Sequence, residues 1–211
     1  VNGALPASFI PRLPEIRDQV DIGIAEVGWL ISLAAITGLV GSIVVGPLIE
    51  RFGTRRVMLA AGVVISASLG VIGLAQTPAI LLIGLIGMTG FDVLVDVSMN
   101  MQASWLSARR HTPVMNRLHG LWSLGTVVGG LAAAWIAAIG ISLRYHLLGA
   151  GTILLLALVY VGRGLLRVDE SHESNGDSLS APPRRRINST LVLFILAGIF
   201  AVTLEITASD W

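Results

Sequence analysis

The chain has 211 residues, of which 54% are hydrophobic and only 13% are charged, and its mean hydropathy is +0.81. Soluble domains carry about a quarter charged residues, so this composition excludes that class and indicates an integral membrane protein. The formal net charge of +1 identifies no partner, and the absence of cysteine excludes disulfides, thiolate nucleophiles and cysteine metal sites.

The first residues read as the outer end of an incomplete first membrane helix. The apolar stretch before Pro11 is too short for a span, which needs about 20 residues, and it lacks the basic start of a signal peptide. Pro11 and Pro14 are expected to break the helix. Residues 15–26 contain both acidic and basic side chains and are expected to form a mixed-charge external loop.

A glycine- and arginine-rich segment, residues 46–56, separates the second span, residues 27–49, from the third, residues 57–75. We expect a short cytoplasmic hairpin there, because arginines disfavour the hydrocarbon and gather on the cytoplasmic side. A glycine at each end of the segment permits a tight turn. Glu50 is expected to pair with one of the arginines or with a neighbouring helix end.

This segment resembles the signature loop between helices 2 and 3 of the major facilitator superfamily, roughly G-x-L-a-D-r-x-G-r-[RK]. The matching residues are Gly46, Leu48, Arg51, Gly53, Arg55 and Arg56. Glu50 takes the place of the usual Asp, and Thr54 that of the usual basic residue. The resemblance implies a twelve-helix transporter, in which this loop is a conformational gate and not a substrate site.

The fourth span, residues 79 to about 99, carries the side chains on which the functional prediction depends. Asp92, Asp96 and Asn100 are spaced four apart, so they share one helical face. An ionisable group within a span costs about 2.5–3.5 kcal/mol, and we therefore expect this face to line an interior cavity. Two close carboxylates repel, which favours protonation of one of them, so Asp92 and Asp96 are predicted to couple protons. The alternative is that they neutralise a buried arginine or bond a helix end; Asn100 is a predicted solute contact.

The fifth span, residues 117–141, places His119 and Ser123 four residues apart, with Trp122 beside them. His119 is expected at a depth similar to that of Asp96, where it can relay protons; the alternative is an interfacial histidine bonded to a loop carbonyl. Ser123 is a predicted polar contact for a solute. Trp122 is either a stacking surface for a ring or a lipid-facing side chain.

The sixth span covers residues 145–166. Residues 1–167 are thus expected to form an N-terminal six-helix domain, and residues 168–189, which are polar and contain two prolines, a cytoplasmic linker. Residues 190–211 read as the start of a seventh helix in a second domain. Glu205 is expected to line the cavity from that side.

The distribution of arginine supports this topology. Eleven arginines lie in segments assigned to the cytoplasmic side and three in external segments, as the positive-inside rule predicts. The cytoplasmic set includes Arg109 and Arg110, which are placed in the loop between the fourth and fifth spans. The loop after the second span and the linker are therefore expected in the cytoplasm, and the inner membrane of a bacterium is the expected location.

Four motifs together resemble a bacterial branch of the superfamily described as fucose-permease-like. They are PRLPEIR after the first helix, DVSMN in the fourth, residues 119–130 in the fifth and ExxxxDW in the seventh. The resemblance implies proton-coupled sugar uptake with an acid of the fourth helix, here Asp92 or Asp96.

We therefore expect an all-α polytopic membrane protein, the N-terminal half of a secondary transporter that works by alternating access. Its expected partners are a small solute, protons and the lipid bilayer, and it is expected to act as a monomer. No cofactor, metal or nucleic acid is expected.

Two other functions stay open. An efflux antiporter would export drugs or metabolites, although the Gly-Pro pair typical of the fifth helix of proton/drug antiporters is absent, since Val127 and Val128 precede Gly129. A membrane scaffold or sensor would keep the fold without turnover. The sequence contains no Gly-x-Ser-x-Gly elbow, HExxH pair or glycine-rich phosphate loop, so it predicts no enzyme and no catalytic residue.

Overall fold

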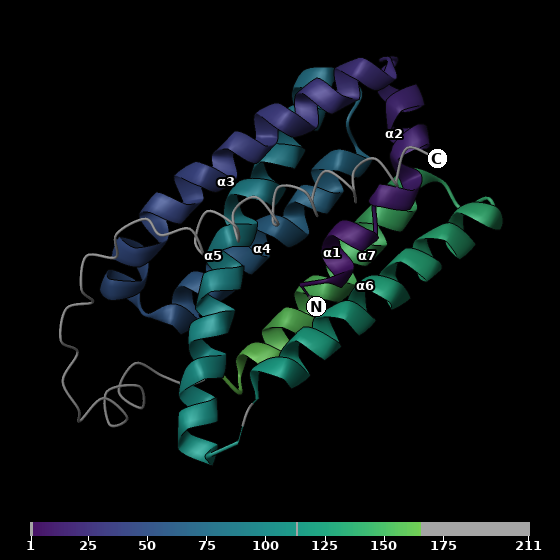
Figure 1. Cartoon of the computed structure of the whole chain (residues 1–211). Coiled ribbons are helices and arrows are strands. Elements are labelled where there is room, and N and C mark those ends of the chain that lie inside the picture. Colours follow the sequence, from purple (N-terminus) through teal and green to yellow (C-terminus); the bar gives the residue numbers. More distant parts are fainter. Residues whose placement is uncertain (1, 113, 166–211) are drawn as a thin grey trace, which may run out of the picture. The chain divides into compact units, whose positions relative to one another are not determined.

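The computed structural model describes residues 2–112 and 114–165, which belong to the first of two compact units of the chain. In chain order the elements are α1 (Ala4–Ala7), the 3-10 helix η1 (Ile10–Arg12), α2 (Leu13–Val20), α3 (Ile24–Phe52), α4 (Thr54–Gly73), α5 (Pro78–Arg110), α6 (Met115–Ala138) and α7 (Leu143–Gly162) (Figure 1). Helices α3 to α7 are long and apolar enough to cross a membrane, which confirms the predicted all-α polytopic class. The predicted linker, residues 168–189, and the predicted seventh helix, residues 190–211, lie outside the described residues.

Prolines shape the segment before the first long helix. Pro11 lies inside η1 and Pro14 in the first turn of α2, where a missing N–H is tolerated. The expected break in the helix is confirmed, but the loop predicted after it is wrong, because α2 is helical. Ile16 and Val20 explain the difference: they are four residues apart, and both are buried on one face of α2.

The connection between α3 and α4 is a single residue, Gly53, with φ 77° and ψ 153°. Glycine adopts a positive φ at little cost, so the chain turns sharply there. The predicted hairpin over residues 46–56 is wrong at both ends, because α3 continues from Gly46 through Pro47 to Phe52 and α4 already begins at Thr54. A helix that stopped at Gly46 would leave backbone groups without partners in hydrocarbon, whereas proline is tolerated within membrane helices.

Helix α5 is longer than expected. Thr77 caps its start, because the Ile80 N–H donates to Thr77 Oγ1 at 3.4 Å. The helix runs to Arg110, so Arg109 and Arg110 lie in its last turn and not in a loop. No glycine or proline interrupts residues 100–110, and arginines at a helix C-terminus interact favourably with the helix dipole.

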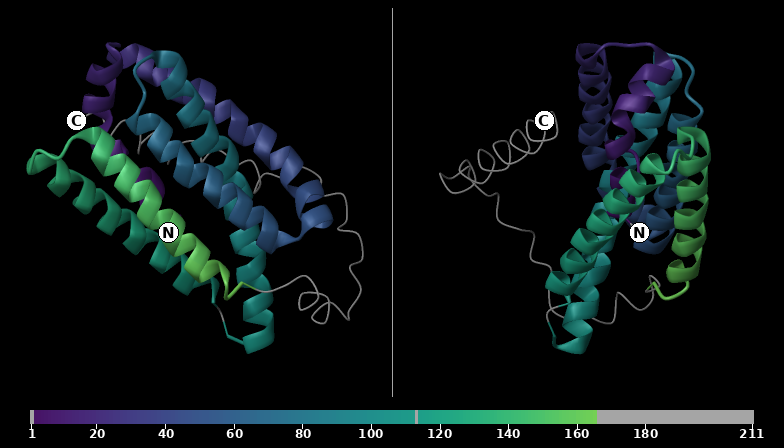
Figure 2. Two further views of the ribbon diagram at one scale, coloured as in Figure 1. Left: turned by 180° about the vertical axis from the view of Figure 1, so that it is seen from behind. Right: turned by 90° about the vertical axis from the view of Figure 1, so that its right-hand side faces the viewer.

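Helix α4 lies at the centre of the described part of the chain. It packs along α5 and α7, α3 packs along α5, and α1 lies against α6 (Figure 1 and Figure 2). Helix α4 supplies deeply buried apolar side chains, among them Ile65, Leu69 and Ile72. Helix α3 approaches α5 closely at Gly41, where a Cβ would lie 2.6 Å from the carbonyl oxygen of Gly90, so this crossing requires a residue without a side chain.

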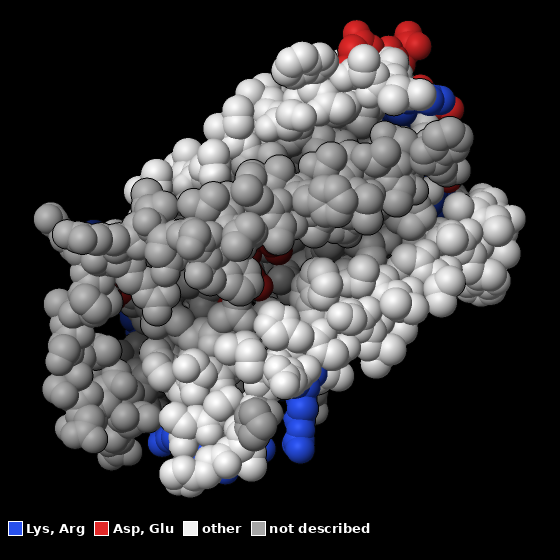
Figure 3. All heavy atoms as spheres, in the orientation of Figure 1, with Lys and Arg blue, Asp and Glu red and all other residues white. Residues whose placement is uncertain are grey.

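Charged side chains gather at the ends of the helices (Figure 3). At the end formed by α2 and the start of α3, Asp18, Asp21 and Glu26 are exposed. At the end formed by the connection from α5 to α6, Arg110 and Arg117 are exposed. The second end is therefore the more basic one.

Candidate functional site

The acidic stripe predicted for the fourth span lies near the middle of α5. The Asn100 Nδ2 donates to Asp96 Oδ2 at 3.1 Å, and the side chain of Asn2, from the segment before α1, hydrogen-bonds the Asp92 carboxylate. Asp92 is exposed in the described part of the chain, while Asp96 and Asn100 are half-buried. Among the described residues neither acid forms an ion pair with an arginine. Each acid therefore has an amide as its neighbour and no described counter-charge.

A cavity of about 520 Å³ lies among the α1 segment, α4, α5, α6 and α7. Its wall on α5 includes Val95, Met99 and Leu106, which share one helical face because they are spaced four and seven apart. At 100° per residue this face adjoins that of Asp92 and Asp96. Most lining side chains are aliphatic. Polar side chains in the wall come from Asn2, Ser66, Gln102 and Arg110.

Of the three residues predicted on α6, the structure brings one to this cavity. Trp122 lines the cavity and is 41% exposed. His119 and Ser123 are exposed and lie outside the wall, so a relay through His119 stays a prediction. Glu205 lies outside the described residues. In the described ranges no three His, Cys, Asp or Glu side chains are grouped as a metal site requires.

The predicted gate surrounds the connection from α3 to α4. Glu50, Arg51 and Arg56 are exposed, and Arg55 is half-buried. The expected pairing of Glu50 is not found within the described part, where Glu50 forms no ion pair; an exposed carboxylate is solvated and gains little from a partner. The guanidinium of Arg51 instead lies 5.2 Å from the centre of the Phe52 ring.

A buried hydrogen bond beside this connection was not predicted from the sequence. The Gln102 Nε2 donates to Thr54 Oγ1 at 2.8 Å, and the two residues are 7% and 3% exposed. Because Gln102 also lines the cavity, the bond joins the first residue of α4 to the cavity wall. The available signal was Thr54 itself, which stands where the superfamily signature usually has a basic residue.

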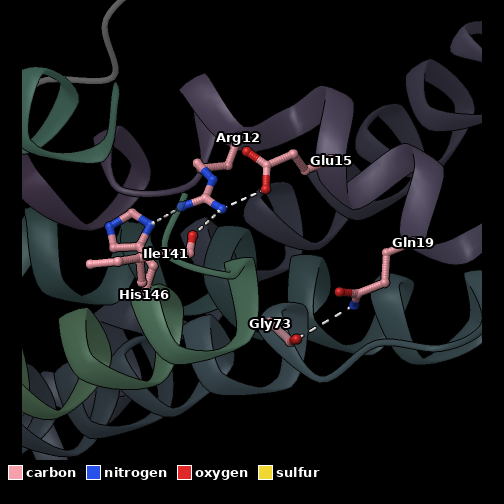
Figure 4. Close-up of polar contacts among 6 residues, drawn as sticks. All are labelled: Arg12, Glu15, Gln19, Gly73, Ile141 and His146. Atoms are coloured by element: carbon pink, nitrogen blue, oxygen red, sulfur yellow. Dashed lines mark hydrogen bonds and ion pairs between the residues drawn. The ribbon is translucent and has the colours of Figure 1, made fainter. Parts of the chain in front are cut away.

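A second missed group lies at the opposite end of the helices (Figure 4). This Arg12 network consists of Arg12, Glu15, Ile141 and His146. Arg12 is only 1% exposed; its Nη2 donates to the Glu15 carboxylate and, at 2.9 Å, to the Ile141 carbonyl oxygen. Its Nη1 lies 3.4 Å from His146 Nδ1. Arginine can only donate, so Nδ1 accepts and the ring is neutral.

The Arg12 network ties the segment after α1 to the connection between α6 and α7 and to α7 itself. Nearby, Gln19 Nε2 donates to the carbonyl oxygens of Gly73 at 3.4 Å and Ala75 at 2.6 Å, which fastens α2 to the end of α4. The sequence signal for this region was a lone arginine between two prolines, in a segment predicted to be external.

Known membrane transporters resemble this chain. The sequence profile of the Major Facilitator Superfamily matches residues 2–209. An uncharacterized MFS-type transporter of Yersinia pestis is 26% identical over 79% of the chain and 44% of the relative. An uncharacterized transporter of Sinorhizobium fredii is 29% identical over 100% of the chain and 55% of that relative. Membrane protein MosC of Rhizobium meliloti is 23% identical over 100% of the chain and 50% of that relative. No solved structure matches the chain significantly.

The chain spans about half the length of these relatives. The family profile nevertheless covers nearly all of it, and the five long apolar helices are those of a multi-pass membrane protein. This chain belongs to the Major Facilitator Superfamily.

Proposed function

We propose that this chain is the N-terminal half of a secondary transporter that carries a small, sugar-like solute across the cytoplasmic membrane together with protons. The supporting observation is the stripe on α5, where Asp92 and Asp96 lie one turn apart near the middle of a membrane-spanning helix. Each has an amide neighbour and no described arginine partner. Acids at this depth are costly and mark proton or ion pathways.

Protonation changes the hydrogen bonds that the stripe can form. Charged carboxylates only accept, whereas a protonated carboxyl also donates. Loss of one charge also removes the repulsion between Asp92 and Asp96. A solute hydroxyl both donates and accepts, so it suits a half-protonated pair with the amide of Asn100 beside it. In this proposal proton and solute are bound together, and the sugar class rests on the resemblance to the fucose-permease-like motifs.

The other predicted contacts have different support. Trp122 lines the neighbouring apolar cavity, which does not include Asp92, Asp96 or Asn100, so its role as a stacking surface remains a prediction. Ser123 and Glu205 remain predicted solute contacts, and His119 a predicted relay. The α3–α4 connection is assigned to the cytoplasm because it is rich in arginine; in the proposed cycle, charged contacts of Glu50 and its neighbours form in one state and break in the other.

An efflux antiporter is the second candidate function. It is favoured by one observation, the mainly apolar lining of the 520 Å³ cavity, because a wall of this kind suits amphipathic compounds. The two functions move protons in opposite directions relative to the solute, so the direction of proton flux separates them.

The test uses the full-length protein in proteoliposomes with a pH-sensitive dye inside. Addition of a transported sugar is expected to acidify the interior, and at least one of Asp92→Asn and Asp96→Asn is expected to abolish this response. Asp18→Asn, which alters an exposed acid of α2, is the matched control and should leave the response unchanged. Proton movement in the opposite direction on addition of amphipathic cations would favour efflux, and no proton movement with any solute would contradict the proposal.

A further inference from the structure

The 520 Å³ cavity has a size and lining that suit a ligand other than a sugar. Its volume is in the range of small-molecule sites, roughly 300–1,000 Å³. Along α5 it reaches from Val95 to Arg110, about 22 Å at the rise of an α-helix. The side chains along this length are mainly aliphatic or thioether groups, such as Met58, Met99 and Leu158. An elongated apolar body therefore fits this wall better than a polyol, whose hydroxyls would lack partners.

Two polar atoms in the wall have no hydrogen-bond partner. Ser66, in the middle of α4, is only 3% exposed, and its Oγ is unpartnered. The Oδ1 of Asn2 is likewise buried and unpartnered, while the same side chain hydrogen-bonds Asp92. Both residues line the cavity. Native structures rarely leave such atoms unsatisfied, so the pair points to a ligand group that bonds them.

The chemistry of these two atoms selects the group. The Asn2 amide oxygen can only accept, whereas the Ser66 hydroxyl can donate or accept. A carboxylate cannot donate to Asn2, and an ammonium ion, which only donates, would leave the hydrogen of the Ser66 hydroxyl without an acceptor. A hydroxyl group donates once and accepts twice, so it is suited to both partners.

We propose that this cavity binds an amphiphile with an aliphatic chain and a terminal hydroxyl group. The hydroxyl donates to Asn2 Oδ1 and accepts from Ser66 Oγ, and the chain extends along α5 toward Arg110. The assignment concerns binding alone and does not rest on proton-coupled transport. Because the Asn2 side chain also bonds Asp92, a ligand bound in the cavity would hold the Asn2 amide in place beside this proposed coupling acid.

The test is photolabelling of the full-length protein in lipid nanodiscs with a diazirine derivative of octanol, followed by peptide mapping. Saturable labelling is expected on the peptides that contain Met58, Met99 and Leu121, with displacement by unlabelled octanol and not by octanoate. Ser66→Ala should weaken binding up to about tenfold, the loss of one buried hydrogen bond. Ser98→Ala is the matched control: Ser98 is also buried with an unpartnered hydroxyl, but it lies outside the wall.

A second variant tests the position of the chain. Leu121→Trp adds bulk at a lining residue that is 63% exposed, so it should block labelling without disturbing a packed contact. Unsaturable labelling spread over the lipid-facing helices would overturn the proposal. So would equal labelling of the wild type and Ser66→Ala, or stronger displacement by octanoate. Proton flux is measured separately in proteoliposomes, so a failure to detect proton flux would leave the labelling result unaffected.

Discussion

Replacement of the buried arginine at the α2 end of the helices gives a quantitative test of the fold. Arg12→Met keeps an apolar stem but removes the guanidinium, which bonds Glu15 and the Ile141 carbonyl oxygen and contacts His146. Loss of one partner of a buried pair costs about 3–5 kcal/mol. Glu15 is 46% exposed and can regain water, so the ion pair contributes less than that. A charged hydrogen bond to the carbonyl contributes about 1.5–3 kcal/mol, and we expect a total loss of about 2–4 kcal/mol.

The assay is thermal unfolding of the full-length protein in detergent, followed by tryptophan fluorescence. A loss of this size lowers the midpoint by roughly 5–15 °C. Arg17→Met is the matched control, because Arg17 forms an exposed pair with Asp18 and its loss should cost at most about 0.5 kcal/mol. Equal midpoints for the two variants would refute the stabilising role of the buried arginine.

Three further predictions concern other contacts. Thr54→Val and Gln102→Leu each strand a buried polar partner, so each should lower the free energy of unfolding by about 1–3 kcal/mol, and a double-mutant cycle should show less than additive losses. Gly41→Leu should lower the unfolding midpoint through a clash between α3 and α5, whereas Gly46→Ala, with nothing within 4 Å of the new Cβ, should be neutral. Acid protonates the His146 ring, which then repels the Arg12 guanidinium 3.4 Å away. The stability from the Arg12 network is therefore present at high pH and lost as the pH falls, so the midpoint difference caused by the arginine substitution should shrink.

Each of these predictions has a clear contrary result. Additive losses in the cycle would contradict the direct bond between α4 and α5. An unchanged unfolding midpoint for Gly41→Leu would contradict the close approach of α3 to α5. A midpoint difference that is constant with pH would contradict a neutral histidine in the Arg12 network.

Hydropathy was sufficient to predict the second to sixth spans, which correspond to α3 to α7, because lipid imposes the same requirement on every membrane helix. The ends of the spans were harder to predict, because Gly46 and Pro47 are residue types typical of a turn and Arg109 and Arg110 are typical of a loop. In the structure the first pair lies within α3 and the second within α5. Helices extend beyond the apolar core where nothing in the local sequence stops them, and hydropathy does not report that extension.

The acidic stripe could be placed on one face from its spacing alone, since helical periodicity fixes that geometry. The Arg12 network and the hydrogen bond between Thr54 and Gln102 could not be predicted from the sequence. Arg12 and His146 are 134 residues apart, and Thr54 and Gln102 are 48 apart. Such contacts depend on how whole helices pack, and the sequence of either partner carries only a weak signal of the other.

In the proposed function, the acids of α5 couple the movement of protons to that of a solute. The most direct measurement compares two assays on full-length Asp92→Asn and Asp96→Asn in proteoliposomes: solute accumulation driven by a pH gradient, and solute exchange at equal pH. We predict that at least one variant loses accumulation and keeps exchange, because binding and the change of state persist without a titratable group. Normal pH-driven accumulation by both variants would contradict the claim.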